Sequence, residues 1–261
     1  MAWWGKVVGG TFGFLIGGPI GAMLGASLGH RIDQGLSQSD QRQRYFPGDQ
    51  ERTQAAFFTA TFLVMGHIAK ADGKVSANEI SLANQLMNHM QLGKAQKKAA
   101  IELFDRGKAA EFDLAGVLMQ FRQECHRRST LLRMFLEIQV QVAFADGRLD
   151  PKENIILSEI AQALGFRHSD LQMIIEMMRG GSAAQASNKG FVSDPYKTLG
   201  VTADTPYHEI KNAYRRLLSQ HHPDKLVSKG LPEEMVKLAN EKTHEIRMAW
   251  QRVQEIHKGD S

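Results

Sequence analysis

The sequence has almost no cysteine, since Cys125 is the only one among 261 residues. A single thiol forms no internal disulfide, and a reducing compartment such as the cytoplasm fits this composition. We expect Cys125 to be packed as a small hydrophobic side chain. The charge shows little excess of either sign, with 32 Lys and Arg against 28 Asp and Glu. This balance argues against nucleic acid as the main partner.

The alternation of apolar and polar residues that is typical of a half-buried strand is also missing between Ala55 and Met178. Apolar residues recur there at helical spacing, and the turn signals between the segments are short. The clearest segments are Phe57–Ala69, Ile80–Met90, Leu114–Arg122, Leu131–Phe144 and Ile155–Leu164. We therefore predict an all-α protein in which residues 55–178 form a compact bundle of six to eight helices.

Charge is absent from Val7 to Gly29. About 20 apolar residues in a helix cross the hydrocarbon core of a bilayer, so we expect a single transmembrane helix at residues 7–30. Small residues recur at every fourth position of this segment. They are Gly5, Gly9, Gly13, Gly17, Gly21, Gly25 and Gly29. This spacing lets two helices approach closely in lipid, which predicts a homodimer through the transmembrane helix.

The charges around this apolar run predict its orientation. Lys6 precedes the run and four arginines follow it: Arg31, Arg42, Arg44 and Arg52. The domains that follow the run should thus be cytoplasmic, with residues 1–6 on the opposite side of the membrane. A cleaved signal peptide fits less well, because the run is longer than a usual signal core. A helical hairpin turning at Gly18-Pro19 also fits less well, because each arm would be too short to span.

Two polar segments separate the expected domains. Residues 31–54 are rich in Gln, Ser, Asp and Arg and predict a cytoplasmic tether. Residues 179–193 are small and polar and predict a flexible linker. Such a linker would let the last domain, residues 194–261, swing from its anchored base.

An internal repeat lies within the helical region. Residues 71–79 and 145–153 share the pattern Ala-Asp-Gly-basic-aliphatic-x-x-x-Glu, each between two apolar helices. The repeat resembles the TerB-like domain, which is named for tellurite-resistance proteins. Its carboxylates suggest a metal site: Asp72, Glu79, Asp146 and Glu153. The loops lack the alternating acidic ligands of an EF-hand, however, so we expect helix caps at Ser76 or Asp150 and no metal or cofactor.

The most specific pattern lies between residues 210 and 225. The apolar residues at helical spacing are Ile210, Ala213, Tyr214, Leu217 and Leu218. Lys211 and Arg215 lie on the opposite face, so the helix is amphipathic with a basic outer side. Pro223 disfavours helical backbone at His222, so the helix should end there and leave Asp224 on an exposed turn. A basic face and a His-Pro-Asp turn are thus presented together.

The neighbouring segments extend this pattern. A short helix closed by Gly200 precedes it, Asp204-Thr205-Pro206 predicts a cap and a first-turn proline, and a long helix with one apolar stripe follows. This order of elements resembles the J-domain, the defining module of the DnaJ co-chaperones. In that family the basic helix and the His-Pro-Asp loop dock on ATP-bound DnaK and accelerate its ATP hydrolysis. The matching positions are Lys211, Tyr214, Arg215, Arg216, His222, Pro223 and Asp224.

The resemblance implies that this chain is not an enzyme and has no catalytic residue, because the hydrolysis takes place in DnaK. The order of Gly-rich anchor, TerB-like domain and J-domain resembles membrane-anchored DnaJ-like co-chaperones over nearly the whole chain. That family implies a location in the bacterial inner membrane, with residues 1–6 in the periplasm and the C-terminal domains in the cytoplasm. It also implies a regulatory role in envelope-stress signalling and in the synthesis of the capsule polysaccharide colanic acid. Two other hypotheses stay open: a metal- or stress-sensing scaffold based on the helical domain, and a Gly-rich oligomeric pore.

Overall fold

All regular structure in the described part of this computed structural model is helical, which confirms the all-α prediction. The described residues are 49–71, 81, 84, 87, 88, 92–126, 128–144, 148–185 and 194–259. The expected transmembrane helix and its glycines, from Gly5 to Gly29, lie outside them. Over the described ranges, no helix combines the length and the apolar character needed to cross a membrane.

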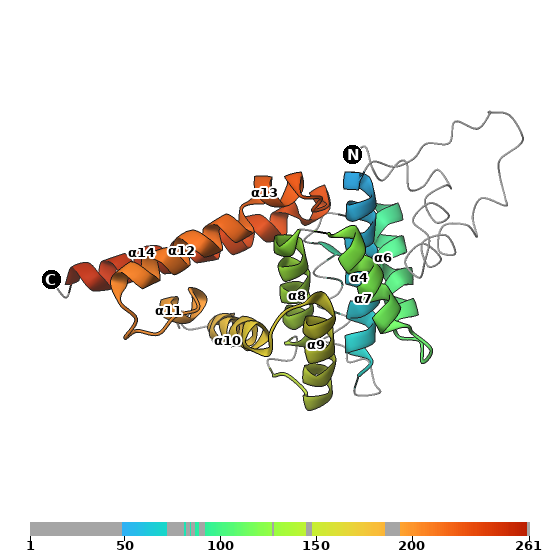
Figure 1. Cartoon of the computed structure of the whole chain (residues 1–261), viewed down its shortest axis with the longest axis horizontal. Helices are drawn as coiled ribbons and strands as arrows, with labels where there is room; N and C mark the ends of the chain where they lie inside the picture. The colour runs from blue at the N-terminus through green and yellow to red at the C-terminus, as the bar shows by residue number, and fades with distance from the viewer. Residues whose placement is uncertain are drawn as a thin grey trace, which may run out of the picture.

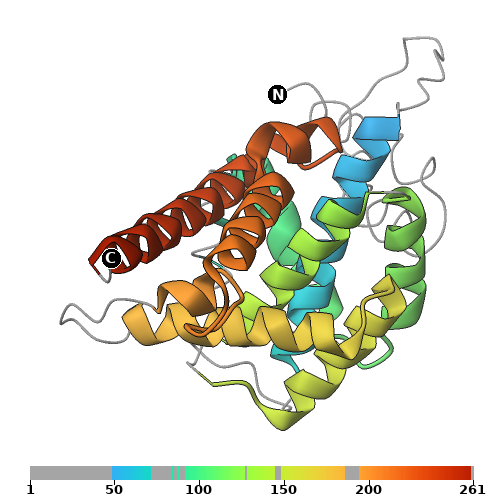
Figure 2. The same cartoon turned by 60° about the vertical axis from the view of Figure 1, so that its left-hand side comes forward.

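The first domain is a helical bundle built around one central helix (Figures 1 and 2). Its elements are α4 (Asp49–Ala69), α6 (Lys94–Gly107), α7 (Leu114–Glu124), α8 (Ser129–Ala143), α9 (Pro151–Leu164) and α10 (His168–Gln185). Helix α4 is buried along most of its length, and α6, α7 and α8 pack around it. The rings of Phe57, Phe121 and Phe135 meet in its core, and the predicted burial of Cys125 is confirmed.

Helices α4 and α6 approach each other closely at two glycines. A Cβ atom on Gly66 would overlap the carbonyl oxygen of Phe104, and one on Gly107 would overlap the carbonyl oxygen of Leu63. At these two positions no side chain separates the backbones of the two helices. The apolar periodicity of the sequence did not predict helix α6, because only a narrow stripe of this helix, centred on Leu103, is buried.

The ends of this domain differ from the expected segment bounds. Helix α4 begins at Asp49, and Thr53 is already buried, with its hydroxyl donating to the carbonyl oxygens of Asp49 and Glu124. Arg52 makes a two-point contact with the Glu124 carboxylate. Polar residues of the expected tether therefore belong to the bundle. Helix α10 likewise extends to Gln185, into the expected linker, and residues 186–193 lie outside the described ranges.

The predicted helix cap in the second copy of the repeat is confirmed. The carboxylate of Asp150 accepts the backbone N–H of Lys152 at 2.8 Å, and the carboxylate of Glu153 accepts the N–H of Asp150 at 2.9 Å. Pro151 occupies the first position of α9, where a missing N–H costs nothing. Three carboxylates of the suggested metal set, Asp72, Glu79 and Asp146, lie outside the described residues. Among the residues that are described, no group of His, Cys, Asp and Glu gathers to hold a metal.

The second domain is a helical hairpin with two short helices (Figure 1). Its elements are α11 (Pro195–Thr198), α12 (Tyr207–His221), α13 (Pro223–Ser228), the 3₁₀ helix η2 (Glu233–Met235) and α14 (Val236–Gly259). Helices α12 and α14 lie antiparallel, and Ile210, Leu217 and Trp250 are part of the core between them. Gly200 closes the segment of α11 at a φ of +67°, as predicted.

The hairpin packs on the bundle at two places. Near α13, Leu226 and Leu231 are buried in the same apolar cluster as the residues of α4 and α8. Near α11, Met177 of α10 is buried in the core of the hairpin. Figures 1 and 2 show the α13 end of the hairpin against the bundle and the C-terminus at its far end. This arrangement differs from the freely swinging domain that the linker composition predicts, because apolar residues of each domain are covered by the other.

Candidate functional site

Helix α12 presents the predicted basic face to solvent. Its apolar residues Ile210 and Leu217 are buried against α14. The side chains of Lys211, Arg215 and Arg216 are exposed. The helix begins at Tyr207 with Pro206 as its N-cap residue, so the expected first-turn proline lies one position too early. The expected cap also differs, because no side chain caps this helix.

Tyr214 has a structural contact that the sequence did not indicate. It is half-buried, and its ring stacks on the indole of Trp250 with centroids 4.9 Å apart and planes at 11°. The ring of Tyr207 stacks on the same indole at 5.5 Å. Tyr214 therefore holds α12 against α14, beside the exposed cations.

The His-Pro-Asp motif forms the junction of two helices. His222 ends α12 in an extended conformation, with φ −62° and ψ 122°, as expected before a proline. Pro223 then begins α13, so Asp224 lies in the first turn of a short helix and not on the turn that the sequence predicts. The exposure predicted for Asp224 is observed. Lys225 donates to the hydroxyl of Ser219 at 2.7 Å and joins the two helices across the motif.

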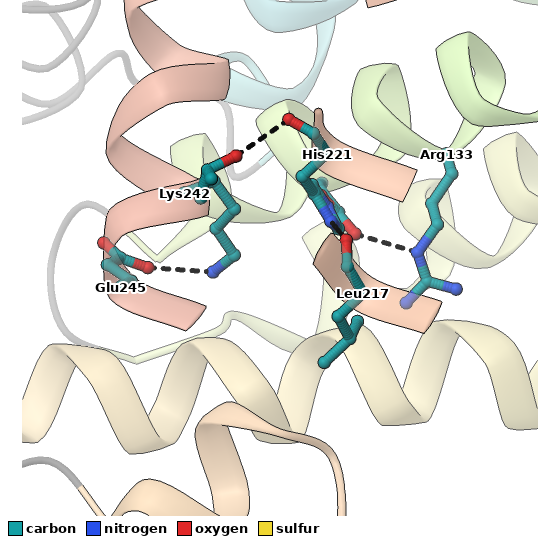
Figure 3. Close-up of polar contacts among 7 residues, drawn as sticks. Arg133, Leu217, His221, Lys242 and Glu245 are labelled. Atoms are coloured by element: carbon teal, nitrogen blue, oxygen red, sulfur yellow. Dashed lines mark hydrogen bonds and ion pairs between the residues drawn. The ribbon is translucent and has the colours of Figure 1, made fainter. Parts of the chain in front are cut away.

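The residue before the motif, His221, is buried between the two domains. Its Nε2 lies 2.7 Å from Oε2 of Glu137 on α8, and its Nδ1 lies 2.9 Å from the carbonyl oxygen of Leu217. Its own carbonyl accepts the hydroxyl of Thr243 on α14 at 2.9 Å. Arg133 donates through Nε to Oε1 of Glu137 at 2.9 Å. Figure 3 shows His221 between Arg133 on one side and Lys242 on the other.

These contacts define the charge of the pair. Both ring nitrogens of His221 face acceptor atoms, and this geometry favours the doubly protonated imidazolium ring. Burial lowers the pKa of His221, but the charge of Glu137 and the hydrogen bond to it raise the pKa above its usual value. Burial raises the pKa of Glu137, but His221 and Arg133 together lower it to about 2. Glu137 and His221 form a buried ion pair.

The segment after the motif makes further contacts with the bundle. Lys229 donates to the hydroxyl of Thr130 at 3.0 Å. Gly230 has a φ of +100° and packs against Thr53 and Arg128, and Arg128 also donates to the hydroxyl of Thr53. Sequence reasoning missed this interface. Its only signal was a charged pair, Arg133 and Glu137, one turn apart in a segment that is otherwise mostly apolar.

Known co-chaperones resemble this chain over nearly their whole length. The co-chaperone protein DjlA of Escherichia coli K12 is 40% identical across an alignment of 270 positions, which covers 98% of each protein. DjlA of Shewanella oneidensis is 42% identical across 260 aligned positions, which cover 97% of each protein. DjlA of Yersinia pestis is 40% identical across 270 aligned positions, which cover 96% of each protein. This chain belongs to the DjlA family of co-chaperones. The predicted resemblance to membrane-anchored DnaJ-like co-chaperones is confirmed.

Three family models match the chain in the predicted order of anchor, TerB-like domain and J-domain. The DjlA transmembrane domain matches residues 1–39, the tellurite resistance protein TerB matches residues 58–175, and the DnaJ domain matches residues 194–258. The basic helix and the His-Pro-Asp motif lie within the DnaJ match, and the pair of Arg133 and Glu137 lies within the TerB match. No solved structure gives a significant match to the chain.

Proposed function

We propose that this DjlA-family protein is a regulatory co-chaperone of DnaK, which docks through α12 and the His-Pro-Asp motif and stimulates ATP hydrolysis by DnaK. The observation that carries this proposal is that α12 and the motif that follows it expose charges of both signs. Lys211, Arg215 and Arg216 are exposed on α12, and the carboxylate of Asp224 is exposed just beyond Pro223. The match of residues 194–258 to the DnaJ domain supports it.

Each charge has a separate task in this mechanism. The three cations accelerate the encounter with an acidic surface of DnaK and orient the approach. Asp224 then supplies a carboxylate that pairs with an arginine of the partner, in a charge-assisted hydrogen bond. The chain forms and breaks no covalent bond. It acts through a higher affinity for one state of DnaK, and the ATP is hydrolysed in DnaK itself.

The location follows from the N-terminal segment. We place residues 7–30 across the bacterial inner membrane, with residues 1–6 in the periplasm, the two helical domains in the cytoplasm and a homodimer formed through the glycines. The match of residues 1–39 to the DjlA transmembrane domain supports the anchor. A protein so placed recruits DnaK to the inner leaflet, where it serves envelope-stress signalling and colanic acid synthesis. This last step rests on the family alone.

The test is a single-turnover ATPase assay of DnaK with the full chain in lipid nanodiscs. Wild-type protein should accelerate hydrolysis, and His222→Gln should abolish the acceleration, because it alters the first residue of the motif. His168→Gln is a matched control, since His168 is exposed at the start of α10 in the other domain. Equal acceleration by His222→Gln and wild type would contradict the proposed function.

A further inference from the structure

The end of α12 is held by a residue of the other domain. His221 precedes the motif directly, and its side chain is only 4% exposed, against 8% for Glu137. The imidazolium joins the carboxylate of α8 to the carbonyl oxygen of Leu217 in its own helix. Because both ring nitrogens are engaged, the ring has one orientation (Figure 3). The last turn of α12 is therefore fixed relative to α8.

The charges around His221 come from each helix packed against it. Helix α8 supplies Glu137 and Arg133, and α14 supplies Lys242, which is itself paired with Glu245 at 3.1 Å. Arg133 and Lys242 both lower the pKa of Glu137, and Lys242 also lowers that of His221. A buried charge without its partner costs folding free energy, so the Glu137 carboxylate and the His221 ring each stabilise the charged form of the other.

The interface leaves the candidate binding surface open. It covers His221, Leu226 and Leu231, whose side chains face the bundle. The binding residues Lys211, Arg215, Arg216 and Asp224 remain exposed in the same structure. The bundle thus holds His221, the residue before the motif, while Asp224 stays exposed and His222 and Pro223 are half-buried. The contact with the bundle therefore leaves Asp224 accessible to a partner protein and does not cover it.

We propose that Glu137 of the TerB-like bundle is a positioning residue for the His-Pro-Asp motif, because its contact with His221 fixes the direction in which Asp224 is presented to DnaK. This inference rests on the proposed function. The J-domain on its own lacks this contact, so the bundle completes the chaperone-binding unit. Without Glu137, the end of α12 samples several orientations, and binding of DnaK has to restrict them at a cost in affinity.

The test compares two substitutions at this position in the full chain. Glu137→Ala removes both the charge and the acceptor, and Glu137→Gln removes the charge but keeps an acceptor of the same shape. We expect the chain concentration that gives half-maximal stimulation of DnaK to rise about tenfold in Glu137→Ala, with the maximal rate little changed. Glu137→Gln should show a smaller rise. Glu102→Gln is the matched control, because Glu102 lies on α6 and pairs with Lys98 of the same helix at 3.8 Å.

The pH profile separates positioning from a simple loss of stability. In wild type the half-maximal concentration should rise as pH increases through the raised pKa of His221, because a neutral ring cannot donate to both Leu217 and Glu137. In Glu137→Gln this rise should be absent. Taking the ratio of variant to wild type at each pH removes the pH dependence of DnaK itself.

A second readout needs no DnaK. Exchange of the amide hydrogens of His222 and of residues 224–228 should be faster in Glu137→Ala than in Glu102→Gln. Unchanged exchange, or Glu137 variants that stimulate DnaK like wild type at every pH, would overturn the positioning role. Stronger stimulation by Glu137→Ala would overturn it too, since the contact would then restrain the motif.

If Glu137→Ala does not fold, Glu137→Gln is used for the test. A wild-type chain that fails to stimulate DnaK contradicts the proposed function, whereas the exchange result still decides the contact.

Discussion

The ring of Tyr214 lies flat on the indole of Trp250, with centroids 4.9 Å apart. This stack joins the helix that carries the basic face to the helix that supports it. Trp250 is almost fully buried, so Trp250→Ala should lower the unfolding free energy by roughly 3 kcal/mol. Tyr214→Phe keeps the stack and should change stability little. Chemical denaturation followed by circular dichroism measures both. A loss in Tyr214→Phe equal to that in Trp250→Ala would contradict the stacking role.

The ion pair of Glu137 and His221 predicts a specific dependence of stability on pH. The folded pKa of His221 is raised, so its contribution to stability is complete below about 6.5 and is lost as pH rises through the raised value. The folded pKa of Glu137 is lowered to about 2, so its contribution is present above about 4.5 and is lost as pH falls toward 2.

Unfolding free energies measured from pH 5 to pH 9 test the alkaline side of this window. Wild type should lose stability relative to Glu137→Gln as pH rises, because only wild type holds a charged ring opposite a carboxylate. Glu102→Gln should follow wild type throughout. Parallel pH curves for wild type and Glu137→Gln would show that Glu137 does not raise the pKa of His221 in the folded protein.

The two glycines between α4 and α6 predict a sharp steric effect. Gly66→Ala places a methyl group against the carbonyl oxygen of Phe104, and both groups belong to rigid helices. We expect a loss of about 3 kcal/mol in unfolding free energy. Gly93→Ala is the control, because its Cβ would only contact the side chain of Gln96 at 3.4 Å. Similar melting temperatures for the two variants would refute the close approach.

The spacing of the N-terminal glycines predicts which of them affect association. Gly13→Leu and Gly17→Leu should weaken the proposed dimer in lipid, because the bulky side chains separate helices that small residues let approach. Gly10→Leu is the control, since Gly10 lies outside the four-residue series. Energy transfer between labelled full-length chains in vesicles measures the dimer. Equal transfer in Gly10→Leu and Gly13→Leu would exclude a role for the spacing.

Local pattern was enough to predict the hairpin of the J-domain. The apolar spacing of α12 and α14 indicates one buried face on each helix. Gly200 marks a left-handed backbone position, and Pro223 restricts the backbone of His222. Pro223 also shows the limit of that reasoning. It ends one helix because of its effect on His222, but it equally favours the first position of the next, so Asp224 lies on α13.

The contact between the domains was beyond sequence reasoning. Glu137 and His221 are 84 positions apart, and neither segment contains a pattern that indicates the contact between them. The same holds for the start of α4, where Arg52 and Thr53 are polar and were therefore predicted to belong to the tether. Their partner is Glu124, 72 and 71 positions away. Polar residues follow no helical period when a distant element satisfies them, so such pairs require the folded structure.

In the proposed mechanism, the carboxylate of Asp224, just beyond Pro223, engages ATP-bound DnaK. Single-turnover hydrolysis by DnaK, measured with full-length Asp224→Asn in nanodiscs, tests it most directly, because this substitution removes the charge and keeps the shape. Asp204→Asn, an exposed aspartate in the loop before α12, is the control. We predict at least a roughly tenfold loss of stimulation in Asp224→Asn, since a hydrogen bond to a charged group contributes about 1.5–3 kcal/mol. Stimulation equal to that of Asp204→Asn and wild type would contradict the account.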